Sequence, residues 1–177
     1  MNGFGTQTVA AIMSAYRVDC IILLPIINLG TAISTVAAQN TGAGLRDRAR
    51  RSLTVGCALM AVISLALSAI VVPFGGRLVG MFGVTEEVQR IGADFFRCLG
   101  SFYIVFGLST AIRGYLEGVG DVLYSGLIGI VMLAARIALS YALAGFYGNM
   151  VIAWAEAYAW CLMLALYVLR TVCRRNR

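Results

Sequence analysis

The sequence has 177 residues, of which 60% are hydrophobic and 12% are charged, and its mean hydropathy is +0.87. Ordinary soluble domains are about 25% charged, so this composition excludes the soluble globular class and predicts an integral membrane protein. All 14 basic residues are arginines, and they gather at the ends of apolar runs, which is a membrane topology signal and argues against a nucleic-acid partner.

Five apolar segments are long enough to cross a bilayer as helices, since one crossing takes roughly 20 residues. They cover residues 8–38, 53–73, 90–113, 122–145 and 149–169. The first segment is long and contains Pro25, so we expect a kink there. The predicted fold is an all-α, polytopic membrane protein in which residues 1–177 form one five-helix membrane domain.

A basic turn is predicted over residues 45–52, where four arginines stand between two apolar segments. Arginine-rich short loops lie on the cytoplasmic side of a membrane. Alternation of the spans then places residues 114–121 and the basic tail 170–177 on the same side, and the N-terminus outside. An odd number of spans with this orientation is explained most simply by a further helix upstream.

Six ionisable residues fall inside the predicted spans, all in their outer halves, and we take them as a candidate charge network: Arg17, Asp19, Asp94, Arg97, Arg136 and Glu156. Such residues are costly in a bilayer and usually functional. Asp19 is the best candidate for reversible protonation. The alternative is that the carboxylates only neutralise the arginines as fixed pairs. Asp94 and Arg97 have the spacing to pair within one helix, and Arg136 has two candidate partners, Glu156 and Asp19.

Five aromatic residues are weaker candidates for a substrate cavity, because aromatic rings stack against organic cations: Tyr16, Tyr103, Phe106, Tyr141 and Trp154. Packing or anchoring at the membrane interface is the alternative. The small residues Gly126, Gly129, Ala134 and Ala135 favour close helix contact. Histidine is absent and the cysteines lack metal-site spacing, so we expect neither an enzyme nor a metal site or cofactor.

Several motifs, taken together in their order and spacing, resemble the second half of a MATE (multidrug and toxic compound extrusion) transporter. They are Asn2-Gly3-Phe4-Gly5-Thr6, Arg17-Val18-Asp19, Leu24-Pro25, the turn containing Gln39, Asn40, Gly42 and Gly44, and the stretch containing Arg113, Gly114, Gly118 and Gly120. In the turn, the amides are expected to satisfy backbone groups at a helix end and the glycines to permit the reversal. A gating role for Asn40 is the alternative.

The resemblance implies two six-helix lobes that export small amphipathic organic cations in exchange for protons or sodium ions, in the cell (inner) membrane of a prokaryote. This chain would supply helices eight to twelve, and a missing N-terminal lobe or a second chain would be its partner besides the lipid bilayer. Some sodium-coupled branches carry a carboxylate where this sequence has Phe102 and Tyr103, which weakens the case for that sodium site.

Two alternative functions stay open at this point. One is a truncated or partner-dependent subunit that does not transport by itself. The other is a lipid-linked oligosaccharide flippase of the same superfamily, which an arginine-rich central cavity would favour.

Overall fold

The computed structural model describes residues 6–175, so motif residues 2–5 and residues 176–177 lie outside the described part. Within it the chain is helical, in the order α1 (Thr6–Ile22), α2 (Leu24–Gly42), α3 (Arg46–Gly80), α4 (Glu86–Ser101), α5 (Tyr103–Gly118), α6 (Val122–Ala142), α7 (Ala144–Tyr147), the 3-10 turn η2 (Gly148–Met150) and α8 (Val151–Arg175). The helices α3, α6 and α8 are each long and apolar enough to cross a membrane, and two bent helix pairs raise the total to as many as five spans. The predicted all-α membrane fold is confirmed.

The first span is broken at Leu23, where α1 and α2 meet at 40°. Pro25 lies in the first turn of α2. A proline fits there because its missing N–H would have no partner within the helix. The predicted kink around Pro25 is therefore confirmed.

The third span is also broken, at Phe102, where α4 and α5 meet at 48°. The prediction of one continuous helix over residues 90–113 is wrong at this point. Gly100 and Ser101 precede the break, and glycine–serine pairs are a known cause of sharp kinks. The hydroxyl of Ser68 on α3 donates a hydrogen bond of 2.6 Å to the carbonyl of Gly100, so this backbone group is satisfied by a neighbouring helix.

The predicted basic turn over residues 45–52 is wrong, because α3 begins at Arg46 and its arginines are helical. The connection is short and uses Gly44 at a φ of 76°, a left-handed conformation that favours glycine. Asn40 donates to the carbonyl of Val36 over 2.7 Å, inside α2, whereas the backbone N–H groups of Ala43 and Gly44 satisfy carbonyls at the end of the helix. The predicted tail 170–177 is likewise helical as far as Arg175. Arginine is a good helix former, so a run of arginines extends a helix as readily as it ends one.

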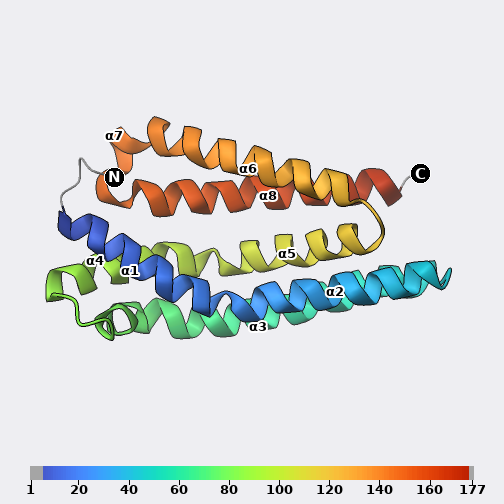
Figure 1. Ribbon diagram of the computed structural model, residues 1–177, viewed down its shortest axis with the longest axis horizontal. Helices are drawn as coiled ribbons and strands as arrows, with labels where there is room; N and C mark the ends of the chain where they lie inside the picture. The colour runs from blue at the N-terminus through green and yellow to red at the C-terminus, as the bar shows by residue number, and fades with distance from the viewer. Residues whose placement is uncertain (1–5, 176–177) are drawn as a thin grey trace.

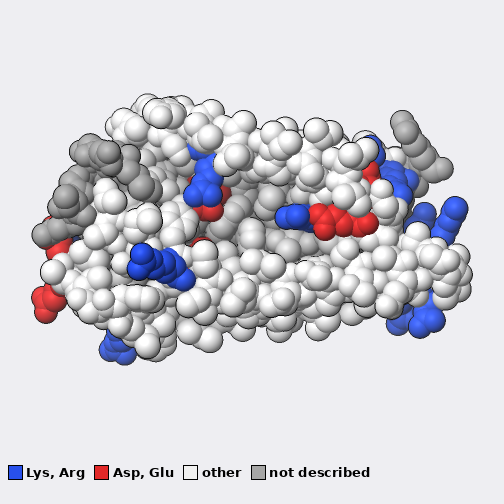
Figure 2. All heavy atoms as spheres, in the orientation of Figure 1, with Lys and Arg blue, Asp and Glu red and all other residues white. Residues whose placement is uncertain are grey.

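The helices lie in layers, with α6 and α8 beside each other and α5 between them and the α1–α4 group (Figure 1). The α2–α3 and α5–α6 connections lie at the same end of the molecule as the end of α8, whereas the start of α1, the α3–α4 connection and α7 lie at the other end. Basic side chains gather at the first of these ends (Figure 2), where the exposed arginines are Arg46, Arg48, Arg50, Arg51 and Arg174.

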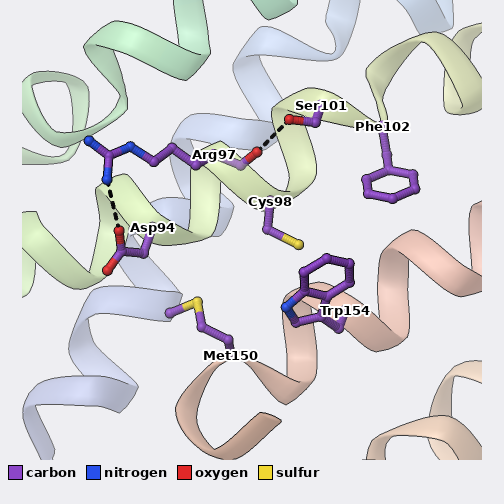
Figure 3. A pocket seen from close by; sticks show the side chains of 7 residues that line it. All are labelled: Asp94, Arg97, Cys98, Ser101, Phe102, Met150 and Trp154. Atoms are coloured by element: carbon purple, nitrogen blue, oxygen red, sulfur yellow. Dashed lines mark hydrogen bonds and ion pairs between the residues drawn. The ribbon is translucent and has the colours of Figure 1, made fainter.

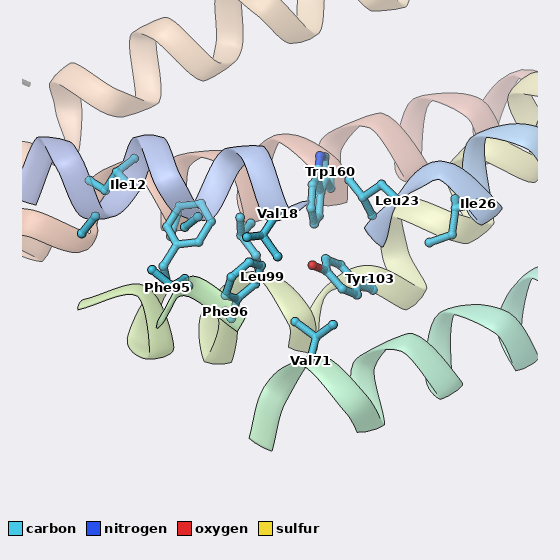
Figure 4. Packing of buried hydrophobic residues seen from close by; sticks show 14 of the residues in the cluster. Ile12, Val18, Leu23, Ile26, Val71, Phe95, Phe96, Leu99, Tyr103 and Trp160 are labelled. Carbon is cyan, nitrogen blue, oxygen red and sulfur yellow. The ribbon is translucent and has the colours of Figure 1, made fainter. Parts of the chain in front are cut away.

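The apolar core lies where α1, α3, α4, α5 and α8 meet, around fully buried aromatic residues such as Phe95, Phe96 and Tyr103 (Figure 4). The backbones of α2 and α5 are in close contact, since a Cβ atom on Gly114 would overlap the carbonyl oxygen of Gly30. By contrast, a Cβ atom on Gly126 or Gly129 would meet nothing within 4 Å. The expectation that these two glycines permit close helix contact is wrong.

Candidate functional site

The two helix breaks meet at a hydrogen bond between Asp19 and Tyr103. Asp19 lies one turn before the break in the first span, and Tyr103 is the first residue of α5, directly after the break in the third span. The Tyr103 hydroxyl donates to Oδ1 of Asp19 over 2.5 Å, and Asp19 is only 4% exposed. No arginine whose side chain the structure describes lies within ion-pair distance of this carboxylate. Asp19 is therefore a buried acid whose hydrogen-bond partner is the neutral phenol of Tyr103.

The second buried carboxylate, Glu156, belongs to a network that joins α1, α6 and α8. Its Oε1 atom is 3.2 Å from Nη1 of Arg136, and its Oε2 atom accepts a 2.5 Å hydrogen bond from the Tyr16 hydroxyl. That hydroxyl in turn accepts a 3.0 Å hydrogen bond from Nη2 of Arg136. Glu156 and Asp19 were the two candidate partners of Arg136, and the arginine pairs with Glu156 in the structure. This carboxylate is thus charge-compensated, unlike Asp19.

The remaining predicted charges lie apart from these two groups. Arg97 and Asp94 form the expected pair within one helix, at 3.2 Å, and both side chains are at least half exposed. Arg17 is exposed on α1 and pairs with no carboxylate in the described part of the chain, so a pair between Arg17 and Asp19 is not formed. Arg97 and Arg136 therefore do not converge on one cavity among the described residues.

One cavity lies beside the Arg136–Glu156 pair, between α5, α6 and α8, and has a volume of about 240 Å³. Phe106 lines it, together with Trp160, which the sequence analysis did not single out. The space-filling view shows charged side chains in a hollow along the middle of an otherwise mostly uncharged face (Figure 2).

A second, open cavity of about 310 Å³ lies between α4 and α8. Figure 3 shows Trp154, Phe102 and Cys98 around this space, with the Arg97 guanidinium directed away from them. Trp154 also stacks on Tyr147 at a ring distance of 5.1 Å.

The other aromatic candidates do not face these cavities in the way that was expected. Tyr141 is 83% exposed and lines neither of them. Tyr16 and Tyr103 serve as hydrogen-bond partners of the two buried carboxylates. Their hydroxyl groups bond to carboxylates here, whereas the sequence analysis considered only their aromatic rings.

The motif stretch that contains Arg113, Gly114 and Gly118 serves helix packing and an ion pair. Nε of Arg113 is 2.7 Å from Oε1 of Glu117, and Ser125 donates to the same oxygen over 2.9 Å. Gly118, like Gly114, lies directly against the α2 backbone.

The α5–α6 connection is clamped onto α8 by an ion pair that the sequence analysis missed. It turns on Gly120 at a φ of 88°, and Arg170 reaches both carboxylate oxygens of Asp121, at 2.7 and 3.0 Å. The hydrogen bond from Arg170, helped by its charge and that of Arg174, holds the pKa of Asp121 below its usual range. The sequence distance of 49 residues explains why local patterns gave no sign of this pair.

A bundle of apolar helices with two broken spans, and with a buried carboxylate where the two breaks meet, is typical of a multi-pass membrane protein. Known proteins narrow this class. The family model described as MatE matches residues 1–142, which is most of the chain. The chain belongs to the MatE family.

Two similar curated proteins come from Bacillus subtilis (strain 168). The "Probable multidrug resistance protein YoeA" is 27% identical over 130 residues, covering 73% of this chain, and the "Probable multidrug resistance protein YpnP" is 24% identical over 123 residues, covering 70%. The match covers 28% of the length of each relative.

Two solved structures share the fold. A crystal structure of a MATE mutant superposes with a TM-score of 0.88 at 19% identity, and it covers 99% of this chain and 40% of the solved one. A crystal structure of MATE in the bent conformation gives a TM-score of 0.82 at 21% identity, covering 94% and 37%.

Proposed function

We propose that the chain is part of a secondary antiporter that exports small amphipathic organic cations in exchange for protons, with Asp19 as the group that binds and releases the proton. The observation that carries the proposal is the burial of Asp19 at the meeting point of two broken spans without an arginine beside it. A carboxylate in such surroundings is held at a high cost unless it takes up a proton or a cation. Glu156, which has Arg136 beside it, does not share this requirement.

The family and the names of the relatives from Bacillus subtilis support a role in multidrug export. Among the described residues that line the cavity between α5, α6 and α8, Arg136 and Glu156 are the charged ones, and they compensate each other. We also propose that a further lobe, from the same polypeptide or from a second one, completes the transport path, because the matched relatives are more than three times longer than the region they share with this chain.

The test of proton coupling is the replacement Asp19→Asn, made in the complete product of the gene that contains this chain. In membrane vesicles energised only by a pH gradient, efflux of a fluorescent organic cation should fall to the level of vesicles without the protein, because asparagine does not titrate. Asp47→Asn, which makes the same chemical change at an exposed residue in the first turn of α3, should leave efflux unchanged.

Retained pH-driven efflux in the Asp19→Asn variant would remove the coupling role. Efflux that depends on Asp19 but responds only to a sodium gradient would make sodium the coupling ion and overturn the proton part of the proposal. Both gradients are therefore applied separately to the same vesicles.

We further propose that the arginine-rich end of the bundle faces the cytoplasm, with α1 starting at the outer side, since exposed arginines collect at that end. Cys173 is exposed near the end of α8, so its chemical labelling shows on which side of the membrane this end lies. A membrane-impermeant maleimide should label it in inside-out vesicles and not in intact cells, and Cys173→Ser should abolish this labelling. Labelling in intact cells would reverse the orientation.

A further inference from the structure

Four arginines lie within the first six residues of α3, at the end of the molecule where basic side chains gather (Figure 2). They are Arg46, Arg48, Arg50 and Arg51, and all four are exposed. None of their guanidinium groups forms an ion pair with a carboxylate in the described part of the chain, and the neighbouring Asp47 is exposed and equally unpaired there. The start of α3 therefore carries a positive charge that no ion pair among the described residues compensates.

Two of these arginines continue into an exposed apolar face of α3. Helix positions that are three or four residues apart lie on the same face. By this spacing, one face of α3 carries Arg48, Arg51, Val55, Leu59 and Val62. The three apolar residues are 49%, 50% and 66% exposed. We call these five residues the α3 stripe.

The other two arginines, Arg46 and Arg50, belong to the opposite face of the helix. The same spacing brings them into line with Leu53 and Cys57, which are half-buried against the core, and with the fully buried Met60. That face packs on the rest of the bundle. The two pairs of arginines thus carry the same charge at the same end of α3, but only one pair borders an apolar surface that is open to lipid.

The α3 stripe has the length and the polarity of one phospholipid. Arg51 and Val62 are separated by eleven helical residues, which span about 16 Å at the usual rise. The hydrocarbon layer of one leaflet is about 15 Å thick, half of the whole core. No charged residue lies between Arg51 and Arg77 in the sequence, so the surface that follows the arginines suits acyl chains.

We propose that the α3 stripe binds an anionic phospholipid, with its phosphate at Arg48 and Arg51 and an acyl chain along Val55, Leu59 and Val62. Guanidinium groups donate charge-assisted hydrogen bonds to phosphate oxygens. A zwitterionic lipid offers the same phosphate, but its ammonium group is repelled by the uncompensated arginines.

Two features set this site apart from a general attraction to negative charge. A soluble polyanion, such as an acidic peptide, has no acyl chain to place on the apolar part of the stripe and would use all four arginines alike. The topology signal of the basic end also counts all four arginines equally. The proposed lipid site distinguishes one pair from the other, and it depends neither on the side of the membrane that this end faces nor on transport.

The test is a titration of the full 177-residue chain, purified in a neutral detergent, with phosphatidylglycerol or with phosphatidylcholine of the same acyl chains. Native mass spectrometry counts the lipids bound to each chain. We expect the Kd for phosphatidylglycerol to be about tenfold lower than that for phosphatidylcholine. An excess of soluble glycerol phosphate should not displace the lipid, because it has no acyl chain.

Two double variants identify the arginines that bind. In Arg48→Gln/Arg51→Gln the Kd for phosphatidylglycerol should rise about 30-fold, about fivefold for each arginine beside an anionic headgroup. The matched control, Arg46→Gln/Arg50→Gln, loses the same charge at the same helix end and should stay within about threefold of the parent value. Glutamine and arginine are similarly good helix formers, so α3 should stay intact in both variants.

Equal weakening by the two double variants would show an attraction to the whole basic end and would overturn the site. Equal affinity for the two lipids, or displacement by glycerol phosphate, would overturn the assignment to an anionic phospholipid. The titration is repeated on the complete product of the gene that contains this chain, where the same pattern is expected. Loss of phosphatidylglycerol binding there would show that other parts of the protein cover the stripe, which would also overturn the proposal.

Discussion

Replacement of Gly114 by alanine is expected to lower the free energy of unfolding by about 3 kcal/mol, at the upper end of the usual cost of overpacking. The added methyl group would overlap the carbonyl oxygen of Gly30, and this neighbour is backbone, which cannot rotate away. The α2 and α5 helices would have to separate along their contact, so the packing around them would be lost as well. Unfolding of the purified chain by a denaturing detergent, followed by circular dichroism, measures the effect.

The matched control is Gly126→Ala, a glycine in α6 with free space around its Cα. Its stability should change by no more than about 1 kcal/mol, the difference in helix propensity between the two residues. Gly118→Ala should behave like Gly114→Ala, because its methyl group would overlap the carbonyl oxygen of Ser34. Wild-type stability in both α5 variants would show that α2 and α5 are not in close contact.

Replacement of Arg136 by methionine is expected to cost about 3 kcal/mol, because it leaves Glu156 buried without its countercharge. Loss of one partner of a buried ion pair typically costs about 3–5 kcal/mol, and we take the lower end because Arg136 is partly exposed. Glu156 itself is only 9% exposed. The same detergent unfolding measurement applies.

The double variant Arg136→Met/Glu156→Leu tests the cause of this loss. Replacement of both charges by apolar groups of similar volume is often close to neutral, so most of the lost stability should return. Glu156→Leu alone should cost less than Arg136→Met alone, since the arginine that remains can reach water. Additive losses in the double variant would contradict an explanation based on the unpaired carboxylate.

The helical architecture could be predicted because the apolar length of a segment is a local property of the sequence. The break at Leu23 could be predicted because Pro25 stands close to it in the sequence. The break at Phe102 had only the adjacent Gly100 and Ser101 as a signal, which is weak in an otherwise apolar stretch. The start of α3 was placed too late and the end of α8 too early because arginines were interpreted as turn or tail residues, although they continue a helix into the polar boundary of the membrane.

The buried acids could be found from the sequence because ionisable groups inside apolar spans are costly, but their partners could not. Tyr103 is 84 residues from Asp19, and Tyr16 is 140 residues from Glu156. Which side chains meet depends on the rotation and depth of each helix, and composition does not determine either. The contact of α2 with α5 did have a readable signal, the four-residue spacing of Gly114 and Gly118, which is the small-residue spacing of close helix pairs in membranes.

The hydrogen bond between Tyr103 and Asp19 has a mechanical consequence. The first half of one bent span, α1, packs on the first half of the other, α4. The second halves, α2 and α5, also pack on each other, so each half of one span contacts one half of the other. A change in the bend of either span must be matched by the other or must break this bond. The two bends are therefore joined, in this structure, through a single carboxylate.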